Sequence, residues 1–157
     1  MGPQPPIVPA NYLINKAIEA GKPLTSLALQ KLLYFLHGHA YARLGYGAVN
    51  EPFQAWQYGP VIPSLYKQLM VSGSSPITMP IYDSQNRDLA SADPNLAKVA
   101  DKVWDAYGNL SGNQLVSISM ADGSPWNSTY NPQNSDSAMI PEQSIRQYFQ
   151  EREAATK

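Results

Sequence analysis

The chain has 157 residues, of which 43% are hydrophobic and 15% are charged, a composition typical of a globular protein with one domain and a substantial core. Its 11 Lys and Arg residues nearly balance 12 Asp and Glu residues, so the basic stripe of a nucleic-acid-binding protein and the polybasic tether of a membrane-bound one are both missing. There is no cysteine, which excludes disulfides, thiolate metal sites and cysteine nucleophiles and is consistent with a reducing cytosol.

The N-terminal residues MGPQPPIVPA lack the cationic region and the long apolar run of a signal peptide. Their prolines and glycine indicate a flexible lead-in over residues 1–9, and we expect the protein to be cytoplasmic. The longest nearly apolar run of the chain is too short and too polar to span a membrane. A short helix is predicted from Pro9 to Ala20, and Gly21 ends it.

The segment PLTSLALQKLLYFLHGHAYARLG carries the strongest helix signal of the chain. Thr25 is a natural N-cap, and apolar residues from Leu29 to Leu44 follow the helical period. Because apolar side chains occupy more than one face, we expect this helix to be the buried centre of the domain. Gln30 and Lys31 interrupt its apolar surface. Either a structural pairing, such as Lys31 with a carboxylate, or an exposed contact role would explain these two residues.

The next segment, FQAWQYGPVIPSLY, is crowded with aromatic residues and prolines. Residues 53–58 have strand character, Gly59 and Pro60 interrupt the strand, and VIPSLYKQLM is predicted as a helix with a proline in its first turn. The alternation of Ile77, Met79 and Ile81 predicts an edge strand, which we expect to pair with residues 53–58 as a small antiparallel element.

Two interpretations fit this crowded segment. In the first, Gly59 and Pro60 form a tight junction between strand and helix, while Trp56 and Tyr58 pack on the central helix. In the second, exposed Trp and Tyr side chains beside a rigid turn form a binding surface, since rings supply contact area with little loss of entropy. We expect a structural junction that also presents a recognition surface, and not a catalytic loop.

The C-terminal half is predicted to be helical around one polar loop. Asp93 and Pro94 begin an amphipathic helix that ends at Gly108, and a capping box of Ser111 and Gln114 begins another that runs through Ala121. DGSPWNSTYNPQNSDSA is predicted to be a long polar loop, and Pro141 to begin the last helix. Residues 151–157 are expected to form a polar tail. The fold class is therefore mainly α: a single compact helical domain over residues 10–150 with a small antiparallel β element.

The sequence shows little sign of catalytic or metal chemistry. His37 and His39, two residues apart on a helix, point about 200° from each other and cannot jointly bind one metal ion. Phosphate-binding glycine motifs and a nucleophile elbow are missing, and the carboxylates lack calcium-loop spacing. We expect no catalytic residue, no metal site and no cofactor, and a packing role for both histidines. A small hydrolase that uses Ser and His is the alternative, because such residues meet only in the fold.

Two blocks at their mutual spacing resemble the Panacea domain family, which is also described as SocA-like or phage-associated antitoxin domains. The first block is TSLALQKLLYFLHGHAYARLG, with LQKLLY at Leu29–Tyr34 and a glycine and histidine at residues 38 and 39. The second is EPFQAWQYGPVIPSLY, with F-x-A-W-x-x-G-P-V at Phe53–Val61 and a tyrosine at Tyr66. A later helix and loop end in Pro125-Trp126, and the resemblance spans roughly residues 10 to 150.

This resemblance implies a mostly helical domain with a small β element, and a bacterial or phage protein that neutralises a partner toxin by binding it. The toxin would be encoded by an adjacent gene. A proteolytic adaptor, or a mobile-element or phage protein that binds a host factor, is the alternative; neither a nucleic acid nor a membrane is expected as a partner. Many members carry Thr-His or Ser-His where this chain has Met120-Ala121, a departure that favours a scaffold over a shared active site.

The candidate protein-binding residues come from both blocks and from the later loop. We expect Trp56, Tyr58 and Trp126 to be aromatic anchors for a partner. The anchors are expected to be supported by Gln30, Lys31, Gly59 and Pro60.

Overall fold

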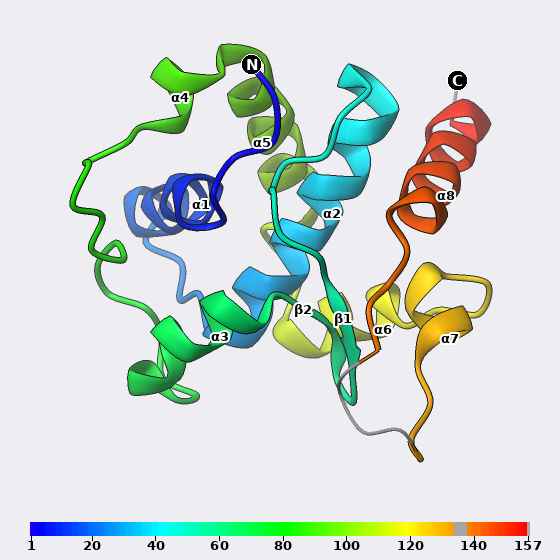
Figure 1. The fold of residues 1–157 in the computed structure, drawn as a ribbon. Coiled ribbons are helices and arrows are strands. Elements are labelled where there is room, and N and C mark those ends of the chain that lie inside the picture. Colours follow the sequence, from blue (N-terminus) through cyan, green and yellow to red (C-terminus); the bar gives the residue numbers. More distant parts are fainter. Residues whose placement is uncertain (134–137, 157) are drawn as a thin grey trace.

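The computed structural model describes residues 1–133 and 138–156 and confirms the predicted mainly α fold with a small antiparallel β element (Figure 1). In chain order the elements are α1 (Ile7–Ala20), α2 (Ser26–Leu44), β1 (Gln54–Trp56), β2 (Gly59–Val61), α3 (Pro63–Leu69), the 3-10 turn η1 (Met70–Ser72), α4 (Leu89–Ala92), α5 (Pro94–Tyr107), α6 (Gly112–Ser119), α7 (Pro125–Thr129) and α8 (Glu142–Ala155).

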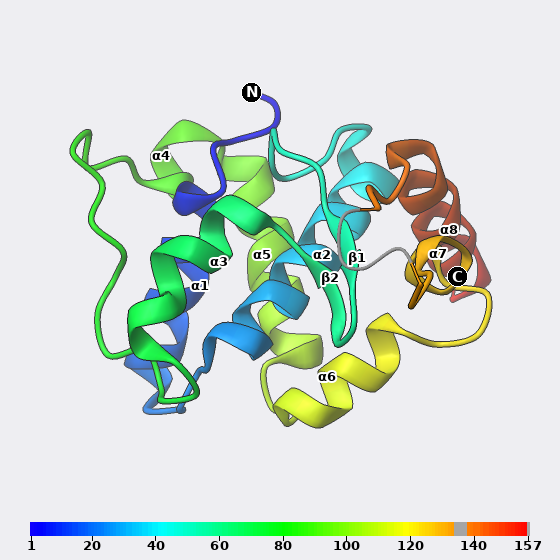
Figure 2. The same ribbon diagram turned by 60° about the horizontal axis from the view of Figure 1, so that its bottom comes forward.

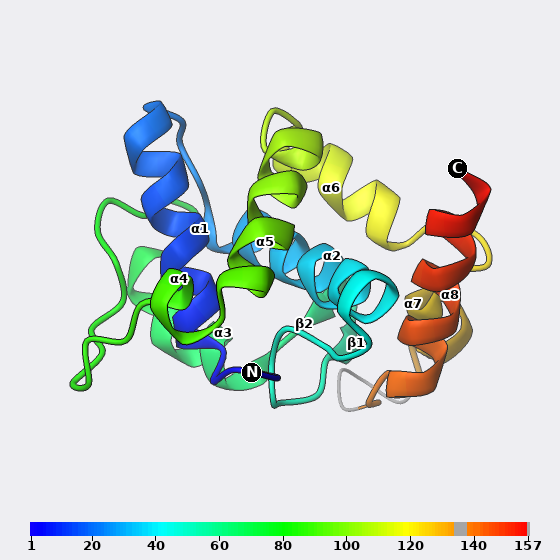
Figure 3. The ribbon, with the colours of Figure 1, turned by 90° about the horizontal axis from the view of Figure 1, so that it is seen from above.

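Helix α2 lies at the centre of the domain, as its apolar sequence predicts. Figures 1 and 3 show it surrounded by the other elements, and it contacts α1, α5, α6, α8 and β2. Every residue from Ala28 to Gly38 is buried. The predicted N-cap is confirmed, because the Thr25 hydroxyl accepts a hydrogen bond from the Ala28 N–H at 3.2 Å. Polar side chains on such a buried helix need hydrogen-bond partners within the protein, and this requirement applies to Gln30 and Lys31.

The surrounding helices begin where their capping residues predict. Asp93 is fully buried and accepts a hydrogen bond from the Leu96 N–H, while its other oxygen accepts one from Tyr46. The capping box of Ser111 and Gln114 is present, with both reciprocal hydrogen bonds formed. These caps fix the starts of α5 and α6, which both pack against α2.

The β element is a hairpin, and the predicted partner for its first strand is wrong. β1 pairs antiparallel with β2, with Trp56 opposite Gly59, so that Gln57 and Tyr58 form the loop. Residues 77–81 do not form a strand in the structure. Their backbone instead bonds α1 and the connection that follows it: Ile77 donates to the Leu24 carbonyl, and the Asn11 side chain bonds both backbone groups of Ile81. Because these groups already have partners, they are not available to β1.

The other edge of β1 is covered by a distant segment that the sequence placed at the end of a polar loop. The Ala55 N–H donates to the Ala138 carbonyl at 2.8 Å, and the Ile140 N–H donates to the Phe53 carbonyl at 2.8 Å. Within the same predicted loop, residues 125–129 form α7, and residues 134–137 lie outside the described part of the chain. No local sequence signal indicates this pairing, because it depends on bonds between residues more than 80 positions apart.

The structure also differs from the prediction at both ends of the domain. Gln4 bonds the backbone of Ala48 and Asn50, and α1 already begins at Ile7, so the expected lead-in is attached to the domain. Helix α8 continues through the expected polar tail to Ala155. Glu153 explains this extension, since its carboxylate bonds both His39 and Arg43 of α2.

Gly38 marks the closest approach of α2 and α8, and its substitution tests this packing. A Cβ atom at Gly38 would lie 2.1 Å from a ring carbon of Phe149. Helix propensity alone predicts that Gly38→Ala would stabilise the protein by up to about 1 kcal/mol. We expect instead a loss of about 1–3 kcal/mol in the free energy of unfolding, because the substitution overpacks the core.

The matched control is Gly112→Ala in the first turn of α6, where an added Cβ meets no atom within 4 Å. Urea unfolding of both variants measures the difference. A Gly38→Ala protein as stable as Gly112→Ala would contradict the observed contact between α2 and α8.

Candidate protein-binding site

Gln30 ties the central helix to the end of the hairpin. Its side-chain amide donates to the Ile62 carbonyl at 3.1 Å, and its side-chain oxygen accepts from the Ile62 N–H at 2.9 Å. The side chain is 3% exposed. Ile62 lies between β2 and α3, and the Tyr66 N–H of α3 also donates to its carbonyl at 3.0 Å. Gln30 therefore supplies the partner of the Ile62 N–H and a second donor to its carbonyl.

Lys31 makes a second bond to the same stretch of backbone. Its side chain is completely buried, and Nζ donates to the Pro60 carbonyl at 2.9 Å. It makes no ion pair with any residue in the part of the chain that the structure describes. Burial lowers the pKa of the Lys31 amine from 10.5 to about 7, because the charged form is poorly solvated. The predicted structural pairing is therefore with a backbone carbonyl and not with a carboxylate.

Gly59 allows the hairpin to approach the Lys31 side chain. Its φ of +110° is strained for any residue with a side chain, and an added Cβ would lie 2.6 Å from Cε of Lys31 and 2.8 Å from Oγ of Ser119. Pro60, which follows, is buried and offers only its carbonyl, the group that Lys31 binds. Gly59 and Pro60 are thus the place where the hairpin rests on α2 and α6.

A groove lies between the first turns of α2, the hairpin and α3. Figure 2 shows how these three elements are arranged. The groove encloses about 270 Å³. The residues that line it include Gln30 and Lys31, together with Leu27, Trp56, Tyr58 and Tyr66.

The rim of the groove is aromatic and accessible. Tyr58, at the hairpin tip, is 60% exposed, and Tyr66 of α3 is 44% exposed. Trp56 is half-buried; its ring packs edge-on against Tyr66 at 4.9 Å, and its indole N–H donates to the side chain of Gln54. Trp56 and Tyr66 therefore hold each other in position, while Tyr58 is placed by the hairpin loop and stays in contact with solvent.

Trp126, the third predicted aromatic anchor, does not line this groove. It is 7% exposed, its indole N–H donates to the Trp56 carbonyl at 2.7 Å, and its ring stacks on Tyr130. Trp126 belongs to α7, and this hydrogen bond holds the backbone of β1, the strand that carries Trp56. The structure thus places Gln30, Lys31, Trp56 and Tyr58 around one cavity, with Gly59 and Pro60 beneath the hairpin and Trp126 behind it.

Sequence reasoning missed Leu27 and Tyr66 as groove residues. Leu27 is 38% exposed on the first turn of α2, a position that the sequence treats as part of a second apolar face. Tyr66 belongs to the same crowded segment as Trp56 and lies one helical turn after Ile62. The signal that could have identified Tyr66 as a groove residue is its position in the predicted helix directly after the aromatic strand.

The two histidines serve structural contacts. His37 is fully buried; its Nδ1 accepts from the Val49 N–H, and its Nε2 therefore donates to Glu142 at 2.7 Å. His39 donates through Nδ1 to Glu153 and accepts through Nε2 from Tyr107, and burial lowers its pKa below the ordinary value. In the described part of the chain neither histidine hydrogen-bonds a serine, which is the contact that a Ser/His hydrolase would show.

Two further searches of residues 1–133 and 138–156 gave negative results. No three His, Asp or Glu side chains there are placed to hold a metal ion together. None of the described helices is both long and apolar enough to cross a bilayer.

The chain is similar in sequence to known proteins. The sequence profile of the family described as "Antitoxin SocA-like, Panacea domain" matches residues 29–127, which include the hairpin and every residue of the groove except Ser26 and Leu27. The chain is also similar to a protein named "Antitoxin SocA" from Caulobacter vibrioides (strain NA1000 / CB15N), with 36% identity over 126 residues. The similarity covers 74% of this chain but only 65% of that relative's length. No solved structure matches the chain.

The buried amine of Lys31 makes a testable contribution to stability. Between its folded pKa of about 7 and its unfolded value of 10.5, the unfolded chain holds a proton that the folded chain does not. The free energy of unfolding must therefore rise with pH across this window, by at most about 1.4 kcal/mol per pH unit. We expect the stability difference between the wild type and Lys31→Met to shift in favour of the wild type as pH rises.

Urea unfolding of both proteins between about pH 7 and pH 10 measures this shift, because all other titrating groups are common to the pair. A difference that stays constant across the window would show that the Lys31 pKa is not lowered by burial.

Proposed function

The chain belongs to the antitoxin SocA-like, Panacea domain family, and from this premise we propose that it is an antitoxin that neutralises a protein toxin by direct binding in the hairpin groove. The hairpin groove is the cavity lined by Leu27, Gln30, Lys31, Trp56, Tyr58 and Tyr66. The observation that carries the proposal is an accessible aromatic rim on a fixed support within the segment that matches the family.

The support favours binding because little conformational freedom remains to be lost. Three hydrogen bonds from Gln30 and Lys31 fix residues 60–62, and the Trp126 indole fixes the backbone at Trp56. A partner that contacts Tyr58 therefore meets a surface that is already arranged, and pre-arranged surfaces bind more tightly than those that order on contact.

The chemistry of the groove indicates the kind of partner segment that fits. Its walls are mostly apolar, and its charged member, Lys31, is completely buried and engaged with Pro60. We expect the toxin to insert an apolar or aromatic side chain between Tyr58 and Tyr66, since such side chains dominate the centres of protein interfaces.

The proposed function is tested by expressing the chain together with the product of its immediate genomic neighbour. The proposal predicts that the neighbour is toxic alone, that co-expression restores growth, and that the two proteins purify as a complex. A harmless neighbour that does not co-purify would remove the support for this toxin–antitoxin pair. Restored growth with loss of the neighbour protein, instead of a stable complex, would favour the proteolytic adaptor.

Tyr58→Ala tests the groove itself. Removal of an exposed ring from the tip of the hairpin should leave the melting temperature nearly unchanged but weaken toxin binding by at least about 10-fold, the effect of a hot-spot residue. Calorimetric titration of the purified toxin measures the affinity, and growth rescue gives an independent readout.

The control is Tyr82→Ala, which removes a ring that is 84% exposed but does not line the groove. We expect the control to bind the toxin like the wild type. Equal affinities for the Tyr58→Ala and Tyr82→Ala proteins would place the toxin-binding surface outside the groove.

A further inference from the structure

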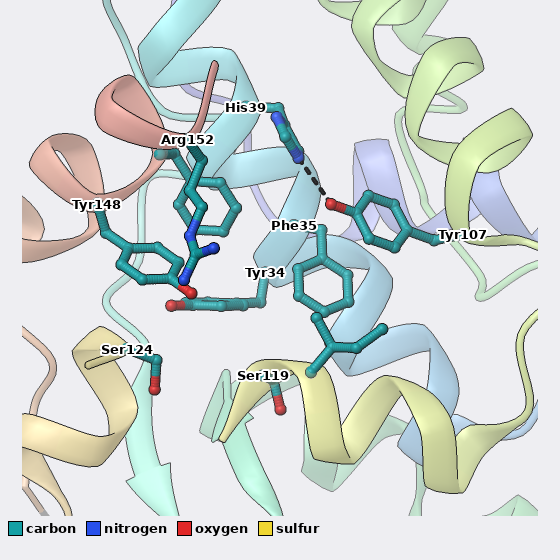
Figure 4. Close-up of a pocket in the computed structure, with 10 residues that line it drawn as sticks. Tyr34, Phe35, His39, Tyr107, Ser119, Ser124, Tyr148 and Arg152 are labelled. Carbon is teal, nitrogen blue, oxygen red and sulfur yellow. Dashed lines mark hydrogen bonds between the residues drawn. The ribbon is translucent and has the colours of Figure 1, made fainter. Parts of the chain in front are cut away.

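A second cavity lies next to α2, between α5, α6 and α8 (Figure 4). It encloses about 160 Å³, close to the roughly 150 Å³ of an engineered cavity that holds a benzene molecule. None of its lining residues lines the hairpin groove. The cavity is therefore a separate site large enough for a ligand about the size of one ring.

Tyr34, at the base of this cavity, has a hydroxyl group with no hydrogen-bond partner among the described residues. The residue is 1% exposed, and its ring is held edge-on by Phe53 and Phe149. Nearly all buried polar groups in proteins are paired, because an unpaired one destabilises the folded state. Because Tyr34 lines the cavity, its unpaired hydroxyl is a group to which a ligand bound there would be able to form a hydrogen bond.

Other donors converge on the same end of the cavity. Figure 4 shows the Tyr34 and Tyr148 hydroxyls pointing toward each other, with Arg152 extending across Tyr148 and Ser124 below them. The Arg152 guanidinium carbon lies 4.5 Å from the centre of the Tyr148 ring. The Ser124 hydroxyl accepts a hydrogen bond from the Asn127 N–H, so its hydrogen is still available to a ligand. The donors thus come from α2, from α8 and from the start of α7.

The charge at this end of the cavity is a single positive one. Arg152 makes no ion pair with any residue that the structure describes. Two carboxylates flank it in sequence. Glu153 is already bonded to Arg43 and His39, and Glu151 accepts a hydrogen bond from Gln147; neither lines the cavity. Burial also lowers the pKa of His39, which disfavours a second positive charge there. Arg152 is therefore the charge that a ligand would meet.

The opposite walls are apolar. Phe35 stacks on Tyr107 at 4.5 Å, and Phe149 and Ile118 complete this surface. One positive charge and several neutral donors match a group with one negative charge, and the apolar walls match a hydrocarbon part of about ring size. A phosphate dianion would leave one of its charges without a partner.

We propose that this cavity binds a carboxylate-bearing group, with its carboxylate between Tyr34, Tyr148 and Arg152 and its hydrocarbon part against Phe35, Ile118 and Phe149. The group is either a small free acid or the side chain of an Asp or Glu residue of a bound protein; the carboxylate chemistry is the same. This site shares no lining residue with the hairpin groove. An experiment that contradicts the carboxylate site therefore leaves the proposed toxin binding unaffected, and the reverse also holds.

The test uses benzoate and its neutral isostere benzamide as probes, with the amide resonances of residues 119–126 and 148–152 followed by NMR. We expect saturable binding of benzoate with a Kd of about 1 mM or tighter, the range of well-placed ligands of this size. Benzamide should bind at least about 10-fold more weakly, because it lacks the charge that Arg152 pairs with.

Two substitutions make the test specific. Tyr34→Phe removes only the unpaired hydroxyl, and Arg152→Gln removes the charge; each should weaken benzoate binding by about 10-fold or more. Tyr34→Phe should at the same time raise the melting temperature of the ligand-free protein, because it removes a buried unpaired polar group. The matched control is Arg146→Gln on the same helix, whose guanidinium lies over Tyr41, outside the cavity.

Equal binding of benzoate and benzamide would overturn the proposal and leave an apolar cavity. So would an affinity for benzoate that stays within about twofold of the wild type in either the Tyr34→Phe or the Arg152→Gln protein. A parallel titration with N-acetylglutamate α-amide distinguishes the sources. Tighter binding of the glutamate derivative assigns the site to an acidic side chain of a protein, and tighter binding of benzoate assigns it to a free aromatic acid.

Discussion

The architecture of both sites depends on polar side chains placed inside a helix that is buried on all sides. Gln30 and Lys31 cannot reach solvent from α2, so they bond the backbone of the hairpin at Ile62 and Pro60. These bonds are strong constraints, because breaking one leaves a buried polar group without a partner. The hairpin has only two short strands, which would be marginally stable alone. Its position is therefore set by α2, with Trp126 and the segment around Ala138 holding its other strand.

One short motif, LQKLLY, serves the two cavities at once. Gln30 and Lys31 hold the hairpin on one side of α2, and Tyr34, one turn later, supplies the unpaired hydroxyl of the second cavity. Ser119 of α6 lies between these regions: it lines the second cavity, and an added Cβ at Gly59 would collide with it. A ligand in one cavity and a partner in the other would thus act on neighbouring residues of the same rigid helix.

Local signals in the sequence predicted most of the helices, and long-range bonds account for what it missed. The caps at Thr25, Asp93 and Ser111 are short-range hydrogen bonds, so their residue types alone identify them. The strand pairing was predicted wrongly because the backbone of residues 77–81 is bonded to Leu24 and Asn11, which no periodicity shows. For the proposed site, the sequence identified the segment that supplies most of the groove lining. It could not tell that Tyr58 is exposed while Trp126 is buried. The burial of Trp126 depends on the Trp56 carbonyl, 70 positions away, to which its indole N–H donates, and Tyr58 lies in the hairpin loop.

The most direct measurement of the central claim is amide hydrogen exchange of the chain alone and in complex with the proposed toxin partner. If the aromatic rim on its fixed support is the binding surface, the toxin will slow exchange at Leu27, at the hairpin residues 56–61 and at Tyr66. The interior amides of α2 will be slow in both states. Slower exchange confined to other surfaces, such as α1 and the segment around α4, with the hairpin unchanged, would contradict the claim.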